Sequence, residues 1–529
     1  MKPLEKLTSQ LTAGKIGRRQ FMEGALALGA TALAAEGLMS QALAADPKQG
    51  GRLRLGIGHG STTDSLDPST HENGYMQNVA YTYANNLTEV DETGNLVPEL
   101  AESWDASDDA RTWTFKLRPG VEFHNGKTVT SDDVITSMNH HRGTDSKSSA
   151  TALLEQVADI RADGDGTVVF ELETGNADWP FIVSDYHLLI LPAKDGKMDW
   201  QAKAGTGAYK IESYDPGVRS FFTKNPNYFK EGRGHFDEVE TIAIIDPAAR
   251  QNAVTTGEVD VIDRVDLKTA HLLDRVPSVG ILETTGTLHY TFPMRTDTAP
   301  FDNNDVRMAL KLAVDREELL KKILRGRGSL GNDHPISVAN RYHNGDLPQR
   351  SYDPEKAKWH LKQAGAEGLT VDLSSADAAF NGAVDAAVLY KEHAAKAGIT
   401  INVVREPNDG YWSNVWNKKP WCACYWGGRP TEDWMFSAAY SNDAKWNDTV
   451  FRNDKFNDLL IEARAELNDD KRRELYGEMQ QILSDEGGTL CPMFANHVHA
   501  VSTKVGHGEN VAGNWQLDGN KCGERWWFS

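Results

Sequence analysis

Alternating apolar and polar positions mark short strands in the first part of the chain. The alternation is clear at residues 52–57 and 113–118, and an apolar run at 168–172 follows two Asp-Gly pairs. A period of two is the pattern of a strand that buries one face. We therefore expect strands to dominate the segment that ends near residue 204.

Helical spacing becomes clear in the second part of the chain. Asp315 begins a capping sequence with a glutamate three residues later, and Asp353 precedes a proline at the first helical position. Apolar residues at helical spacing predict two helices within 454–485. A helix over 382–397 is expected before a strand at 399–404.

Composition and charge narrow the class of protein. The chain has 529 residues, of which 40% are hydrophobic and 25% are charged, as in an ordinary globular protein of two to four domains. Its formal charge of −20 repels phosphate backbones and anionic lipids, so we expect no nucleic-acid partner. A mean hydropathy of −0.52 argues against a polytopic membrane protein.

The first 44 residues have the pattern of an export signal. The pair Arg18-Arg19 precedes an apolar core at 25–35, and small residues end at Ala44. A basic region, a short apolar core and an Ala-x-Ala site are typical of a secretory signal, and the paired arginines resemble a twin-arginine signal. Its core is well short of the ~20 residues that span a bilayer. We expect a periplasmic protein cleaved near Ala44; an amphipathic helix or a membrane anchor is the alternative.

No motif supports catalysis. The glycines of 120–128 are separated by five residues, whereas a phosphate-binding loop needs four, and Asn125-Gly126 predicts a hairpin turn. His140 and His141 are adjacent and face different directions, so they cannot readily chelate one ion. We expect no enzyme, no metal and no cofactor.

Several blocks in one order identify a family resemblance. Residues 98–104, 113–126 and 131–134 resemble the signature of family 5 solute-binding proteins, the dipeptide, oligopeptide and nickel type of ABC importer receptor. Three later blocks also resemble the family, namely 205–209 with 225–228, 301–316, and 352–357.

The resemblance implies an α/β, two-lobed periplasmic binding protein type II fold with an extra domain and a ligand cleft between the lobes. It also implies a monomer that closes on a small-molecule ligand and docks on ABC permease subunits. The expected boundaries are 46–84 plus 205–286 plus 490–529 for domain I, 85–204 for domain II and 287–489 for domain III.

The same resemblance implies a change of charge in the pocket. Counted from Trp426, Arg429 occupies the place of the aspartate that meets a peptide amine in the family. Asp377 falls near the place of the arginine that meets the carboxylate. The ligand is then expected to be acidic or zwitterionic, such as an opine-like compound or an unusual peptide. Alternatively, Arg429 and Asp377 pair with each other or lie on the surface.

Further ligand contacts are expected from aromatic and polar residues. Trp426 offers a flat face for stacking or for a cation–π contact. The remaining candidates are Glu72, Asn73 and Tyr75 in domain I and His187 in domain II.

The four cysteines predict no zinc site, because their spacing does not fit one. Cys422 and Cys424 would lie on one face of a strand, where they are too far apart for an unstrained disulfide bond. Cys491 and Cys522 could form a disulfide. The expected function is that of a periplasmic receptor of an ABC importer. The alternatives are a carrier of a metal chelate or haem, and a periplasmic hydrolase on the same scaffold.

Overall fold

The computed structural model describes residues 18–28, 47–143, 146–408, 410–429 and 431–529. Most of the expected export signal, including its apolar core beyond Leu28 and the cleavage site near Ala44, lies outside the described residues. Of that segment, only the helix α2 (Arg18–Ala27) and Leu28 are described. In the parts that are described, no helix combines the length and the apolar character needed to cross a membrane.

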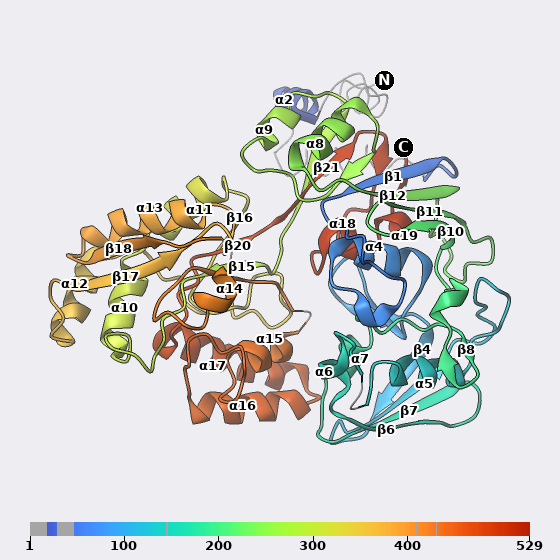
Figure 1. Ribbon diagram of the computed structural model, residues 1–529, viewed down its shortest axis with the longest axis horizontal. Coiled ribbons are helices and arrows are strands. Elements are labelled where there is room, and N and C mark those ends of the chain that lie inside the picture. Colours follow the sequence, from blue (N-terminus) through green and yellow to red (C-terminus); the bar gives the residue numbers. More distant parts are fainter. Residues whose placement is uncertain (1–17, 29–46, 144–145, 409, 430) are drawn as a thin grey trace.

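The first lobe is built on a mixed seven-stranded sheet (Figure 1). β1 lies parallel to its neighbours β12 and β13, whereas the other neighbours run antiparallel. Its strands, in spatial order, are β10 (Tyr209–Asp215), β11 (Arg219–Lys224), β12 (Glu238–Ala243), β1 (Arg52–Ile57), β13 (Val261–Ile262), β21 (His497–Ser502) and β14 (Val279–Thr284).

An antiparallel four-stranded sheet completes this lobe. Phe115 and Phe170 meet edge to face in its core, with ring centroids 5.5 Å apart. The strands, in spatial order, are β4 (Ala101–Ala106), β5 (Thr112–Leu117), β7 (Thr167–Leu172) and β6 (Val157–Ala162). The helices of this part are α5 (Ser131–Asn139), α6 (Thr151–Leu154) and α7 (Trp179–Ile182).

The second lobe holds two small sheets covered by helices. One sheet has the order β16 (Gly328–Leu330), β20 (Met493–Ala495), β15 (His289–Thr291) and β19 (Cys424–Trp426). The other is the parallel pair β17 (Thr370–Ser375) and β18 (Thr400–Arg405). The helices are α10 (Asn304–Leu312), α11 (Arg316–Ile323), α12 (Pro354–Gln363), α13 (Ala383–Ala395), α14 (Tyr411–Asn414), α15 (Glu432–Ala439), α16 (Asp454–Ala465) and α17 (Asp469–Glu486).

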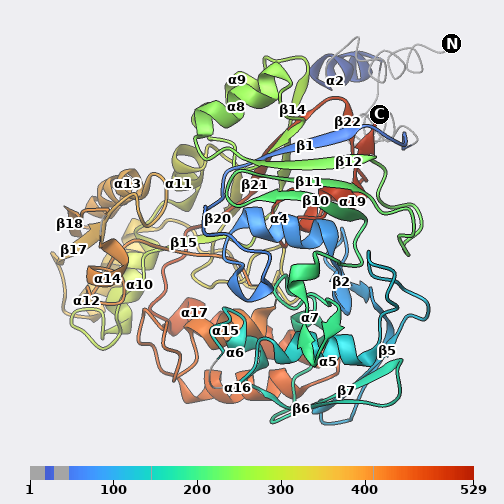
Figure 2. The same cartoon turned by 45° about the vertical axis from the view of Figure 1, so that its right-hand side comes forward.

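The chain passes between the lobes twice at one end of the molecule. It leaves the seven-stranded sheet after β14 and enters the second lobe at β15, and it returns from β20 to β21 (Figures 1 and 2). Two crossing segments of this kind suit a hinge between rigid bodies.

The remaining elements pack against these sheets. The helices are α4 (Gly74–Tyr83), α8 (Pro247–Thr256), α9 (Ala270–Leu273), α18 (Gln516–Gly519) and α19 (Cys522–Arg525), with 3-10 turns at Pro68–Thr70 and Trp200–Ala202. The short strands are β2 (Thr88–Val90), β3 (Leu96–Pro98), β8 (Ala193–Lys194), β9 (Lys197–Met198), β22 (Val505–Gly506) and β23 (Trp527–Phe528).

The predicted helix starts are confirmed, because capping is a local property. The Asp315 carboxylate accepts the Glu318 backbone N–H (2.9 Å) at the start of α11, and Asp353 caps α12 before Pro354. The segment 454–485 forms two helices as expected.

The suggested disulfide between Cys491 and Cys522 is wrong. All four cysteines are free and buried. Cys491 lies just before β20 in the second lobe, where its N–H donates to Asp333, whereas Cys522 begins α19 in the core of the first lobe. The crossing from β20 to β21 separates the two thiols.

Candidate functional site

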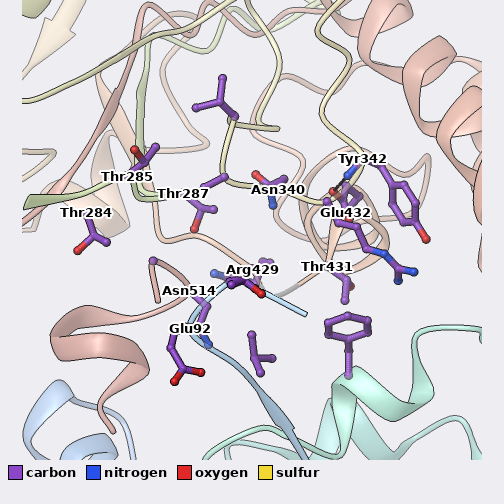
Figure 3. A pocket seen from close by; sticks show the side chains of 18 of the residues that line it. Glu92, Thr284, Thr285, Thr287, Asn340, Tyr342, Arg429, Thr431, Glu432 and Asn514 are labelled. Atoms are coloured by element: carbon purple, nitrogen blue, oxygen red, sulfur yellow. Dashed lines mark hydrogen bonds between the residues drawn. The ribbon is translucent and has the colours of Figure 1, made fainter. Parts of the chain in front are cut away.

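A cavity of about 360 Å³ lies between the two lobes. Figure 3 shows its polar lining, with Arg429 in the middle of the labelled side chains. Residues from both lobes contribute, including the segment that crosses from β14 to β15 and the C-terminal segment around Asn514. The lining comprises Val90, Glu92, Thr93, Gly94, Asp178, Phe181, Thr284, Thr285, Thr287, Val338, Ala339, Asn340, Arg341, Tyr342, Arg429, Thr431, Glu432, Val511, Gly513 and Asn514.

Arg429 reaches this cavity from the segment that follows β19. Two glycines separate it from the strand, and its Nη1 donates to the carbonyl oxygens of Gly427 (2.9 Å) and Gly428 (3.3 Å). No carboxylate of the described chain forms an ion pair with its guanidinium. Arg429 therefore keeps donors for an anionic group in the cavity.

The other cationic and anionic side chains that line the cavity are mostly neutralised by partners. Arg341 pairs with Asp469 and Glu92 pairs with Arg233. The carboxylate of Asp178 pairs with Arg472 at 2.7 Å. These three pairs leave Arg429 and Glu432 as the charged liners without an ion-pair partner among the described residues.

Glu432 is buried at the start of α15. The backbone N–H of Tyr342 donates to its Oε1 (2.7 Å), and only 2% of the residue is exposed. Burial raises the pKa of Glu432 to about 7, and the nearby negative charge of Asp178 adds to the effect. With a pKa of about 7, Glu432 is about half protonated at neutral pH and offsets the positive charge of Arg429 only in part.

Neutral polar groups complete the lining. The side-chain oxygens Oγ1 of Thr284 and Oδ1 of Asn514 are buried and have no hydrogen-bond partner within the described ranges. Buried polar atoms are usually paired, so these two oxygens mark places for a ligand or a water molecule. A second, small cavity of about 20 Å³ shares Val90 and Asn514 with the first and adds Asp185 and Lys521.

Of the residues expected to touch ligand, Arg429 is the one that lines the main cavity. Trp426 is instead buried in the second lobe, where its Nε1 donates to Asp448 (3.3 Å) beside Trp416. Asp377 is exposed on the loop that follows β17 and lies outside both cavities. Neither of the expected contacts to Trp426 and Asp377 gains support from this geometry.

The candidates on the first lobe are engaged with protein groups. Asn73 caps α4 by accepting the N–H groups of Tyr75 (3.0 Å) and Met76 (3.1 Å). The hydroxyl of Tyr75 bonds to Ser220 at 2.7 Å, and exposed Glu72 accepts from Ser149.

His187 has protein partners at both ring nitrogens. Its Nδ1 faces Asp185 at 2.6 Å and its Nε2 faces the carbonyl of His71 at 2.6 Å. It lines neither cavity, as is also true of Glu72, Asn73 and Tyr75. Ligand contact by these four residues stays a prediction.

Sequence reasoning missed Glu432 and Asn514. Glu432 stood in the segment that pointed to Arg429, but nothing in that segment shows that Tyr342 covers it. Asn514 follows a glycine, Gly513, whose added Cβ would lie 2.2 Å from the carbonyl oxygen of Thr285. That close approach brings the segment that contains Asn514 beside the segment that crosses from β14 to β15.

Comparison with known proteins identifies the family. The family of bacterial extracellular solute-binding proteins, family 5, matches residues 95–448. The chain belongs to this family. Its members are substrate-binding proteins of ABC importers, and the two-lobed fold is theirs.

Individual relatives are distant. A glutathione-binding protein of Pectobacterium atrosepticum is 29% identical over 331 residues, which cover 60% of this chain and 63% of the relative, less than two thirds of its length. A heme-binding protein A of Haemophilus influenzae is 27% identical over 426 residues, covering 74% of this chain and 78% of the relative. The structure of AgaA from A. tumefaciens R10 in complex with agropinic acid is similar with a TM-score of 0.72 and 25% identity, covering 90% and 99% of the two chains.

Proposed function

We propose that this protein is the periplasmic receptor of an ABC importer for a small acidic or zwitterionic solute of the peptide-like or opine-like kind. The lobes close on the solute, and the closed protein delivers it to the permease subunits as a monomer. The observation that carries the proposal is the guanidinium of Arg429, which has no ion-pair partner among the described residues, in a cavity whose other cation, Arg341, is paired with Asp469.

Size and chemistry support a small ligand. A cavity of about 360 Å³ lies at the lower end of the ~300–1,000 Å³ of small-molecule sites. A carboxylate or phosphate matches the planar fork of Arg429, and donor groups match the oxygens of Thr284 and Asn514. Relatives that bind glutathione and agropinic acid, both acidic compounds, fit this chemistry.

The domain boundaries and the export route belong to the same proposal. The seven-stranded sheet takes its strands from 46–84, 205–286 and 490–529, which supports one discontinuous domain, with 85–204 and 287–489 as the other two. Within 490–529 this support begins at β21, because β20 pairs with strands of the second lobe. The signal at 1–44 would send the chain through the twin-arginine route and be cleaved near Ala44.

The experiment is native mass spectrometry of the mature protein, followed by denaturation and identification of the released compound. We expect an intact mass that lacks residues 1–44 and a released anionic compound. Arg429→Ala should weaken binding of that compound at least thirtyfold, since loss of one partner of a buried charge pair costs ~2–5 kcal/mol. The exposed Arg275→Ala is the matched control and should bind as the wild type does.

Three outcomes would contradict the proposal. They are a released compound without an anionic group, full affinity in Arg429→Ala, and conversion of the bound compound into a product. A haem absorption band in the purified protein would favour the alternative of a haem carrier, to which the Haemophilus influenzae relative points.

A further inference from the structure

The lobes meet at a buried seam at the end of the cleft that faces away from the crossing strands. Asp178 precedes α7 in the first lobe, and its Oδ1 lies 2.7 Å from Nη2 of Arg472 in α17 of the second lobe. Each side chain is only 3% exposed. The N–H of Ala177 also donates to the carbonyl of Arg464 (2.7 Å), and Figures 1 and 2 both place α7 beside the helices of the second lobe.

Acidic side chains outnumber their cationic partners at this seam. Asp433 pairs with Arg464 at 3.0 Å and Asp178 pairs with Arg472, whereas Glu432 forms no ion pair within the described residues. Other charged and titratable groups also lie around Glu432. They are the ion pair of Arg341 with Asp469, the hydroxyls of Tyr342 and Tyr476, the exposed Arg473, and Arg429, which also lines the cavity.

Closure of the seam makes the ionised form of Glu432 costly. Burial is the main cause, and the carboxylate of Asp178 from the opposite lobe adds repulsion; together they raise the pKa of Glu432 to about 7 from the ordinary 4.5. Opening the lobes removes Asp178 and admits water, so the pKa returns toward its ordinary range. The closed form therefore holds a proton that the open form releases.

We propose that Glu432 is a proton-binding site of the lobe seam, so that closure of the lobes takes up one proton. The site extends the proposed function, on which it rests, because it makes capture of the solute depend on pH. The free energy by which protonation of Glu432 favours the closed form over the open form is fully present below pH 4.5. It is lost as the pH rises through 7.

The test measures the distance between the lobes by paired spin labels in ligand-free mature protein. Glu155→Cys in the first lobe and Asp458→Cys in the second provide exposed label sites, while the four native cysteines are buried. Between pH 8 and pH 5 we expect the ratio of closed to open molecules to rise by about tenfold to a hundredfold. Glu432→Gln, which keeps the shape of the protonated acid, should stay closed at both pH values.

The controls separate this idea from the proposed function. The exposed Glu474→Gln on α17 should respond to pH as the wild type does. Arg429→Ala should lose ligand binding in mass spectrometry yet keep the pH response. The inference is overturned if the wild type does not change with pH, if its lobes stay apart at every pH, or if Glu432→Gln responds as the wild type does. Failure of ligand binding alone would instead contradict the proposed function.

Discussion

Gly428 is the residue that lets the Arg429 segment pass close to the crossing strands. A Cβ built on Gly428 would lie 1.5 Å from Oγ1 of Thr287, whereas a Cβ on Gly427 would meet no atom closer than 3.6 Å. The absence of a side chain at Gly428 therefore positions the guanidinium at the cavity.

This difference predicts the effect of two matched substitutions. Gly428→Ala should force the segment or Thr287 to move, with a loss of ~1–3 kcal/mol in stability and a clear loss of solute affinity. Gly427→Ala should be tolerated in both respects. Urea denaturation and a binding titration with the released solute would measure the two effects. Equal behaviour of the two variants would contradict the steric argument.

Trp426 gives a second prediction at the residue scale. Its indole N–H donates to Asp448, whose pKa burial raises to about 6. Trp426→Phe removes this bond and should lower the free energy of unfolding by ~1–3 kcal/mol, with solute affinity changed by less than about threefold. Trp446→Phe, at a side chain that is 51% exposed, is the control. Lost affinity at unchanged stability would instead support the ligand contact expected from the sequence.

Some residues of the candidate site could be predicted from the sequence, and others could not. The family resemblance pointed to Arg429 by its distance from Trp426, and Arg429 lines the cavity, whereas its contact with a ligand stays a prediction. Glu432 could not be found in the same way, since the N–H group that covers it belongs to Tyr342, 90 residues earlier. The exposure of Asp377 depends on how the loop after β17 packs, which no local pattern encodes.

Among the elements, α17 is held at both ends. Arg472 in its first turn joins the seam, and its last carbonyl groups are met by cations from α10. Nζ of Lys311 donates to the carbonyl oxygens of Leu483 (3.2 Å), Ser484 (2.9 Å) and Gly487 (2.8 Å). The N–H groups of Lys311 satisfy open carbonyls at the helix C-terminus, and burial lowers the pKa of Lys311 to about 7, so that only part of its positive charge remains at neutral pH to oppose the helix dipole.

The cap formed by Lys311 predicts a large effect of one substitution. Lys311→Met should leave the carbonyl of Gly487 without its donor, whereas the carbonyl of Leu483 keeps the N–H of Gly487 and that of Ser484 keeps Arg350. We expect the free energy of unfolding to fall by ~1–3 kcal/mol. The exposed Lys321→Met in neighbouring α11 should change it little. Urea denaturation at pH 7 measures both. A stability of Lys311→Met equal to that of the control would show that the carbonyls find other partners.

Local elements could be predicted, whereas their arrangement could not. The helix starts at Asp315 and Asp353 and the strand at 52–57 follow from capping and alternation within a few residues. The pairing of β1 with 238–243 and of β14 with 497–502 joins segments nearly 190 and more than 200 residues apart. The family resemblance placed these segments in one discontinuous domain but gave no strand pairing, because pairing over such separations leaves no periodic signal in either segment.

On the scale of the whole molecule, buried histidines make the stability of the fold depend on pH. Burial lowers the pKa of eight histidines from 6.5 to about 3 or about 4, and their rings remain neutral in the folded protein. They are His71, His141, His334 and His499 at about 3, and His59, His124, His289 and His497 at about 4.

The sign of their contribution follows from linkage. The unfolded chain takes up these protons near pH 6.5 and the folded protein does not, so the stability present above pH 6.5 falls as the pH drops toward 4. At pH 5, each such histidine lowers the free energy of unfolding by about 2 kcal/mol relative to its value above pH 6.5. Glu432 and Asp448, whose pKa values are raised to about 7 and about 6, act in the opposite direction. Burial also raises the pKa values of Glu99, Asp263 and Asp433, which act in the same direction as these two acids.

We therefore expect the free energy of unfolding, measured by urea at pH 7, 6 and 5, to fall steeply with acid. His71→Leu removes one buried titrating ring and should reduce the fall between pH 7 and pH 5 by about 2 kcal/mol. The exposed His271→Gln should leave the fall unchanged. A flat profile, or the same fall in His71→Leu as in the wild type, would mean that His71 gains its proton in the folded state. Closure of the seam takes up a proton, so acid favours the closed form. The folded protein keeps eight histidines neutral, so acid lowers the free energy of unfolding. Lobe closure and folding stability therefore depend on pH in opposite directions between pH 7 and pH 5.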